Sequence, residues 1–220
     1  MQPIDRPHAR FWHRVSAGSR PEDCGAFAIF RDISPVESGI VLTDAPAANG
    51  RAHLVAGLAC LVLAKLNVGA SPAGALAIAD RSVRSVRRMN EPPLDLACFV
   101  ATLNRSTGVL LYASAGHDLA FILRPDGSTR MLSVTGPRLA TLEKPSFHVR
   151  RIPLQSGGSL VAATAANDAF ATEIARSARI AIQQSADPAA AVVETLSRFR
   201  PIIHDAGCAA LVSMIEEWAA

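Results

Sequence analysis

The chain has 220 residues, of which 50% are apolar and 19% are charged, and its formal net charge is +3. This length is enough for one domain with a sizeable core, and this composition excludes a disordered chain. The small basic surplus gives no indication of a nucleic acid or membrane partner. The arginine-rich stretch 81–88 has helical spacing, which predicts a solvated helix face, with an anion-binding patch as the alternative.

The cysteines, at positions 24, 60, 98 and 208, form no CxxC pair, so neither a structural zinc site nor a redox pair is predicted. Positions 60 and 98 lie in apolar runs that are typical of a core. The first residues carry prolines and charges instead of the apolar run of a secretory signal. The apolar stretch 54–64 is much shorter than the about 20 residues of a membrane span. We therefore expect a cytoplasmic protein.

The predicted elements begin with three strands, which are rich in residues that favour β-structure, at 11–17, 25–31 and 38–43. A loop with Pro46 then leads to a helix at 51–67, which is apolar nearly all round and is expected to be largely buried. Ser71 and Pro72 predict the start of a second helix that extends to Met89 and carries arginines on its outer face.

The second half of the chain predicts five strands, two helices and a last strand. The strands are expected at 96–103, 109–114, 119–124, 147–154 and 159–163, the helices at 168–179 and 188–199, and the last strand at 209–215. This order does not alternate strand and helix, so it predicts an α+β fold of antiparallel sheets with paired helices outside. Residues 1–9 are expected to be a tail and residues 10–216 a single domain.

The middle of the chain carries a more specific pattern. Residues 98–130 read as a strand, a glycine turn, a strand ending in Ala115-Gly116-His117, and a strand running into the Asp126-Gly127 hairpin. Residues 136–140 (GPRLA) follow, with Ala140 where glycine is usual. This pattern resembles the SpoIIE/RsbU type of metal-dependent PPM protein phosphatase, over about residues 10–216. The resemblance implies a four-layer αββα sandwich and a role in bacterial signalling.

The resemblance also implies metal chemistry. Hydrolysis of a phosphomonoester needs an activated water and neutralised phosphate oxygens, and two cations held by carboxylates supply both. Mn²⁺ or Mg²⁺ is the expected cofactor if the chain binds any, because these hard ions prefer oxygen ligands. No protein side chain is then expected to be the nucleophile, since metal-bound water takes that role.

Four residues match the family's metal-ligand positions. Glu22 and Asp23 correspond to the acidic pair near the first strands, and Asp44 corresponds to the bridging aspartate after the third strand. Ala45 stands where a glycine usually lends its carbonyl oxygen to the metal. The alternative for Asp23 and Asp44 is a structural role as turn and cap residues.

Two further ligand positions have lost their carboxylates. Ala165 stands where the family has the aspartate of T-D-G, and Ala206 stands in the place of the late D-D pair. Asp168 and Asp205 are the candidate substitute ligands. Asp168 also suits a helix cap, and a shift of one residue along a strand would turn Asp205 to the opposite face. His117 is interpreted as a structural turn residue, with a contact at the edge of the substrate site as the alternative.

These residues support two hypotheses from different classes. In the first, the chain is a pseudophosphatase that binds a phospho-regulatory protein without chemistry. In the second, it is an active Mg²⁺- or Mn²⁺-dependent serine/threonine phosphatase that acts on an anti-sigma antagonist of the STAS type. Either way the expected partner is a protein, such as a STAS-domain antagonist or an anti-sigma kinase, and neither a nucleic acid nor a membrane is expected. The oligomeric state is not predicted.

Overall fold

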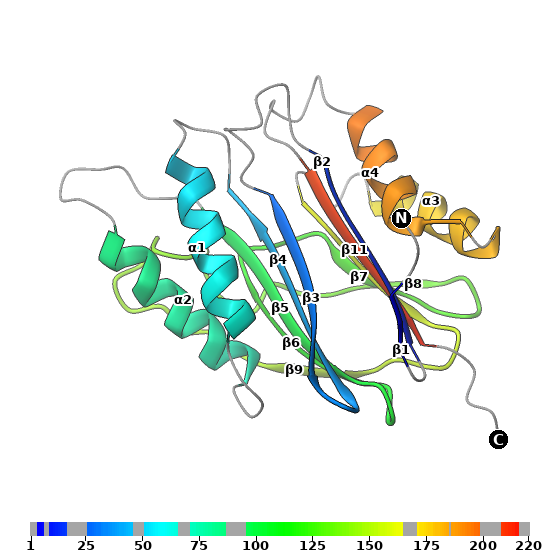
Figure 1. The fold of residues 1–220 in the computed structure, drawn as a ribbon, viewed down its shortest axis with the longest axis horizontal. Helices are drawn as coiled ribbons and strands as arrows, with labels where there is room; N and C mark the ends of the chain where they lie inside the picture. Colours follow the sequence, from blue (N-terminus) through cyan, green and yellow to red (C-terminus); the bar gives the residue numbers. More distant parts are fainter. Residues whose placement is uncertain are drawn as a thin grey trace.

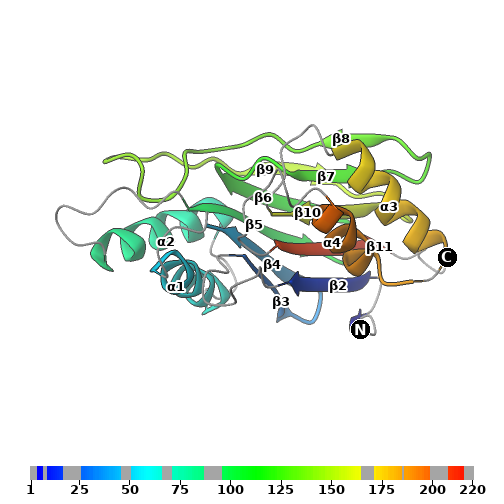
Figure 2. The same ribbon diagram turned by 90° about the horizontal axis from the view of Figure 1, so that it is seen from above.

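A computed structural model describes residues 4–6, 9–16, 26–45, 51–65, 71–86, 96–164, 171–184, 186–198 and 208–215. These described residues form eleven strands in two antiparallel sheets and four helices (Figure 1). The two sheets pack face to face, and a pair of helices covers the outer face of each (Figure 2). The fold is therefore the four-layer αββα sandwich that the sequence predicts.

The first sheet has five strands. Their order across the sheet is β3 (Phe27–Ser34), β4 (Glu37–Asp44), β5 (Ala97–Asn104), β6 (Val109–Ala115) and β9 (Arg150–Pro153). Each strand except β9 follows its neighbour in the chain, so β3 to β6 form a meander. The strand predicted at 147–154 begins only at Arg150, where its pairing with β6 begins.

The second sheet has six strands. Their order is β1 (Ile4–Arg6), β2 (Ala9–Ser16), β11 (Cys208–Ile215), β10 (Ser159–Ala163), β7 (Ala120–Leu123) and β8 (Thr129–Met131). The last strand in the chain, β11, lies between β2 and β10, so the two ends of the domain meet in one sheet. Strand β1 pairs with β2 and lies in the segment that we expected to be a tail.

Two helices lie on each sheet. The helices α1 (Arg51–Lys65) and α2 (Pro72–Val86) cover the five-stranded sheet. The helices α3 (Ala171–Gln183) and α4 (Pro188–Arg198) cover the six-stranded sheet. The helix start predicted at Ser71 has its cap, because Ser71 Oγ accepts the N–H of Gly74 at 3.1 Å. A second cap opens α4, where Asp187 Oδ1 accepts the N–H of Ala190 at 3.0 Å.

Apolar side chains fill three layers, one between the sheets and one under each helix pair. On β4, Ile40 and Leu42 point into the layer between the sheets, whereas Val41 points to the helices. Because both faces of the strand are covered, its sequence is continuously apolar instead of alternating. Among the described helices, none is long and apolar enough to cross a membrane.

One prediction about α1 is wrong. We expected this helix to be largely buried, but Leu54 and Leu61 are 68% and 58% exposed. Val55, Ala59 and Leu63 on the opposite side are buried against the sheet and α2. The helix lies in an outer layer, so only one of its faces packs against the rest of the domain. Its other face is exposed although it carries apolar side chains.

Candidate functional site

Strand ends from both sheets meet at one end of the sandwich, which we call the Asp44 end and which lies at the top of Figure 1. The link between the sheets is short, because β6 ends at Ala115 and β7 begins at Ala120. The end of β6 and the start of β7 therefore lie side by side. The strand registers then bring further strand ends to this end. In the first sheet these are the end of β4 and the starts of β3 and β5, and in the second sheet the ends of β2 and β10 and the start of β11.

Asp44 is the last residue of β4 and lies directly opposite Ala97, the first residue of β5. Its side chain is half-buried, and Ala45 beside it is buried. The sequence placed an acidic residue at the end of the third predicted strand, and β4 does end at this residue. Asp44 as a metal ligand and Ala45 as a carbonyl donor stay predictions.

The other candidate ligand positions lie outside the described residues: Glu22, Asp23, Ala165, Asp168, Asp205 and Ala206. The strands next to them in the chain are described. Phe27 begins β3, Ala163 ends β10 and Cys208 begins β11, and all three strand ends belong to the Asp44 end. The candidate positions are therefore connected by short stretches of chain to the same end of the sandwich.

The described residues by themselves do not form a metal site. Within the described ranges, no three histidine, cysteine, aspartate or glutamate side chains come close enough to hold an ion. Besides Asp44, the loop between β6 and β7 brings one exposed carboxylate, Asp118, to this end. We did not single out Asp118 from the sequence, although its position directly after the Ala-Gly-His tripeptide was a signal for it. One or two carboxylates fall short of the six or so oxygen ligands that Mg²⁺ or Mn²⁺ takes.

His117 lies in the loop between β6 and β7 and is only 3% exposed. Its ring is tilted against that of Phe99, with 6.0 Å between the ring centroids. Ser114 closes the turn, because its hydroxyl donates to the His117 carbonyl at 2.6 Å and accepts the His117 N–H at 3.2 Å. The residue therefore packs at the end of the layer between the sheets, and this geometry favours its structural role.

Burial, helped by the positive charge of Arg138, lowers the pKa of His117 from 6.5 to about 4. The backbone of Ala163 offsets part of this effect, although neither ring nitrogen has a partner with hydrogen-bond geometry among the described residues. The imidazole is therefore neutral at pH 7. A contact of His117 with substrate stays a prediction that would need a more exposed ring.

In the Ala115-Gly116-His117 tripeptide, the backbone conformation requires a glycine at position 116. Its φ angle is +63°, and a Cβ atom there would lie 2.1 Å from Cγ of Arg138. Its N–H donates to the carbonyl of Gly136 at 3.0 Å, which joins the loop to the 136–140 segment. Only glycine combines this conformation with such a close approach.

The 136–140 segment is also fixed to α2 and to the start of β5. The N–H of Leu139 donates to the Leu96 carbonyl at 2.9 Å, and the N–H of Ala140 donates to Asp80 Oδ1 at 2.7 Å. Asp80 is 2% exposed and forms an ion pair with Arg84 at 2.6 Å, and Arg84 also donates to the Leu142 carbonyl. A buried carboxylate on α2 thus connects the helix to the loop beside the Asp44 end.

Two antiparallel sheets between helix pairs, with acidic positions at one end, define the class of PPM-type protein phosphatase domains. The model of the family described as "Stage II sporulation protein E (SpoIIE)" matches residues 38–198 of the chain. The chain therefore belongs to the SpoIIE family, which acts in signalling. A search of curated proteins finds no match.

Solved structures share the fold at low sequence identity. The RsbU and RsbW domains of Rv1364c from Mycobacterium tuberculosis match with a TM-score of 0.76 and 18% identity, over 98% of this chain and 63% of that one. The PP2C phosphatase domain of SpoIIE from Bacillus subtilis, with a fragment of its regulatory domain, matches at 0.73 and 12%, over 96% and 63%. RsbX, solved in complex with magnesium, matches at 0.68 and 10%, over 98% and 99%. The chain thus spans less than two thirds of the first two proteins.

Proposed function

We propose that this SpoIIE-family chain is a degenerate phosphatase, which binds a phospho-regulatory protein partner without hydrolysing its phosphate. The proposal is supported by the sequence beside the strand ends of the Asp44 end. The segments next to the five-stranded sheet keep the acidic residues of the family pattern, whereas those next to the six-stranded sheet carry Ala165 and Ala206 in their place.

The losses belong to neighbouring strands. Ala163 at the end of β10 lies directly opposite Ala210 near the start of β11. Two residues beyond Ala163 the chain has Ala165, and two residues before Cys208 it has Ala206. Both positions carry aspartate in the family pattern described above. Two acidic positions of the family pattern, each two residues from the end of one of these strands, are therefore alanines in this chain.

The remaining donors come from one β-hairpin. Asp44 ends β4, and Glu22 and Asp23 precede β3, the strand that pairs with it. These three carboxylates and the Ala45 carbonyl would form half of a site. A two-metal clamp holds the attacking and leaving oxygens between ions that need ligands on all sides. Half of the ligand set supports at most weak binding of one Mn²⁺ or Mg²⁺ ion, unless Asp168 or Asp205 supplies the missing side.

The partner that suits this reading is a small phosphorylated regulator of the STAS type or an anti-sigma kinase, in the cytoplasm. Two of the similar structures support a protein partner. One has RsbU and RsbW domains in the same protein, and another is from a study of the bacterial stressosome, with 14% identity and a TM-score of 0.68. The chain retains the family fold, so a surface for such a partner can persist after the metal ligands are lost.

The test is calorimetric titration with Mn²⁺, combined with an assay of p-nitrophenyl phosphate hydrolysis in the same buffer. We expect weak or undetectable binding and no turnover from the folded wild-type protein. Asp44→Ala should remove any residual binding, whereas Glu37→Ala, at the opposite end of β4, should leave it unchanged. Tight binding with turnover that Asp44→Ala abolishes would overturn the proposal and make the chain an active phosphatase with substitute ligands.

A further inference from the structure

A hollow lies between two edge strands, β8 of the six-stranded sheet and β9 of the five-stranded sheet, at the end of the sandwich opposite the Asp44 end. It continues the layer between the sheets, because the buried side chains of Ile122 and Ile152, one from each sheet, line it. Pro125 and Pro153 add further apolar walls. Its volume is about 110 Å³. A cavity of about 150 Å³ holds benzene, so this hollow has room for a smaller, compact ligand.

Two arginines face this hollow from adjacent strand positions. Arg130 on β8 lies directly opposite Ile122 on β7, and Arg124 comes two residues after Ile122, so both arginines share the face of that isoleucine. Diagonal neighbours of this kind are roughly 7 Å apart. Two guanidinium groups at this spacing can donate hydrogen bonds to the same small ligand.

The positive charges of these arginines have no counter-charge in the hollow, since its described lining residues include no aspartate or glutamate. Within the described ranges neither guanidinium forms an ion pair, and of the two only Arg124 has a hydrogen bond, a long one of 3.4 Å to Ser128 Oγ. Asp126 on the same hairpin lines a different hollow, beside α3, and its carboxylate accepts the N–H of Ser128 at 2.8 Å. Two like charges at close range repel each other, so an anion between them is favoured.

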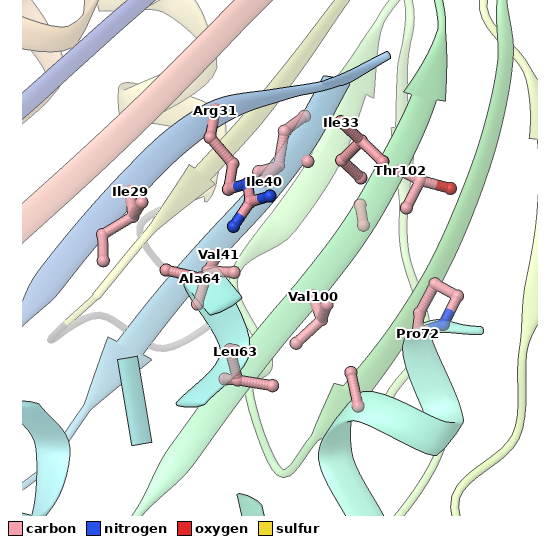
Figure 3. Close-up of a pocket in the computed structure, with 13 residues that line it drawn as sticks. Ile29, Arg31, Ile33, Ile40, Val41, Leu63, Ala64, Pro72, Val100 and Thr102 are labelled. Atoms are coloured by element: carbon pink, nitrogen blue, oxygen red, sulfur yellow. The ribbon is translucent and has the colours of Figure 1, made fainter. Parts of the chain in front are cut away.

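The hollow on the outer face of the five-stranded sheet lacks these properties (Figure 3). It also has an arginine, Arg31, but its volume is about 30 Å³, the share of one water molecule in the liquid. Ile33 fills the space beside Gly39, because a Cβ atom on this glycine would lie 3.0 Å from Cδ1 of Ile33. The hollow between β8 and β9, by contrast, has both space and two cations.

We propose that the hollow between β8 and β9 binds a phosphate group. The phosphate oxygens accept hydrogen bonds from the guanidinium groups of Arg124 and Arg130, and the side-chain amide of Gln155, which also lines the hollow, donates a further one. The charge of phosphate balances the two cations, and guanidinium groups match the geometry of phosphate oxygens. The site lies at the other end of the sandwich from Asp44, so it does not depend on whether a metal binds there.

Titration of the full chain with inorganic phosphate, followed in two-dimensional amide NMR spectra at constant ionic strength, tests this proposal. We expect saturable shifts of the amide signals of Arg130 and Gly158, which line the hollow. Acetate, a monoanion with two oxygens, should bind at least about tenfold more weakly. Glycerol phosphate distinguishes the source of the phosphate group. If it shifts the same signals, the site accepts small phosphomonoesters, and if only inorganic phosphate does so, the ligand is the free ion.

Variants of the two arginines test the hydrogen bonds directly. Arg124→Gln and Arg130→Gln should each weaken phosphate binding at least about tenfold, since each removes a charge-assisted hydrogen bond. Arg198→Gln, an exposed arginine on α4, is the control and should leave phosphate binding unchanged.

Gln155→Glu provides a second test that keeps both arginines, because it places a carboxylate in the hollow. This variant should lose phosphate binding while the urea midpoint of the protein stays near that of the wild type, since Gln155 is exposed. The proposal is overturned if neither inorganic phosphate nor glycerol phosphate saturates a site or if acetate binds equally well. It is also overturned if Gln155→Glu or either arginine variant binds phosphate like the wild type.

Discussion

Ala140 has a backbone conformation that glycine normally occupies, with a φ angle of +59°. Its N–H is held by Asp80, so the surrounding hydrogen bonds impose this conformation on a residue with a side chain. The left-handed region costs a non-glycine residue about 1–2 kcal/mol. The left-handed conformation at this position explains why the family pattern usually has glycine there.

Ala140→Gly is therefore expected to leave the free energy of unfolding within about 0.5 kcal/mol of the wild-type value. The relief of backbone strain offsets the lost burial of a methyl group and the greater chain entropy of glycine. Ala79→Gly is the matched control, because Ala79 is equally buried in the same apolar layer but lies in α2. That change should cost roughly 2 kcal/mol in urea denaturation. Equal losses in the two variants would show that Ala140 is not strained.

His117 predicts a loss of stability in acid. Its pKa is about 4 in the folded protein and 6.5 when exposed, so the unfolded chain takes up the proton first as the pH falls. The contribution of His117 is complete above pH 6.5 and is lost toward pH 4, which amounts to roughly 3 kcal/mol. His117→Leu should remove this part of the pH dependence of urea denaturation. If the wild type and the variant lose stability in parallel between these pH values, His117 does not titrate as described.

The roles of single residues could be predicted from the sequence where a short motif, such as a glycine turn or a helix cap, determines the backbone conformation. Gly116 and the helix cap at Ser71 belong to short patterns whose geometry is local, and the structure has them in place. The role of Asp80 was missed. With Arg84 four residues later it reads as an exposed helical ion pair, and only the loop from residue 136 onward, far away in the sequence, buries it.

At the scale of elements, Asp80 connects α2 to the segment that runs beside the Asp44 end. Asp80→Ala leaves the Ala140 N–H without its acceptor and Arg84 without its counter-charge, so we expect a loss of about 3 kcal/mol in urea denaturation. Asp80→Asn keeps an oxygen for the Ala140 N–H and should lose less, about 1 kcal/mol.

Arg81→Ala, an exposed change on the same helix, is the control and should alter stability by less than about 0.5 kcal/mol. Limited proteolysis provides a second measurement, since Asp80→Ala should increase cleavage in residues 138–144. Equal stability of Asp80→Ala and Arg81→Ala would contradict the connecting role of the carboxylate.

The elements themselves were predicted because their hydrophobic patterns are clear. Strand and helix order, both helix pairs and the burial of both sheet faces follow from the sequence. Two short strands at the edges, β1 and β8, were not predicted as strands, because three residues carry too little pattern. The exposed leucines of α1 show a second limit, since apolar composition alone does not say which layer a helix occupies.

At the scale of the whole molecule, the sandwich brings strand ends from two sheets together at one end. The sequence predicted that Asp44 ends a strand, but it could not show that the end of β4 and the ends of β10 and β11 belong to the same end of the fold. That fact depends on the short crossing from β6 to β7 and on pairings between distant segments. In the proposed function, this arrangement makes Ala165 and Ala206 a single missing side of the site.

The most direct test of this account restores that side. Ala165→Asp/Ala206→Asp should bind Mn²⁺ at least about tenfold more tightly than the wild type in calorimetric titration, because two added carboxylates complete the oxygen ligands around the ion. Gln184→Asp/Ala186→Asp adds the same charge at the turn between α3 and α4 and should leave Mn²⁺ binding unchanged. We expect a gain in the first variant alone, which Asp44→Ala then abolishes. Tight Mn²⁺ binding by the wild type, with no gain in the restored variant, would overturn the proposed loss of this side of the site.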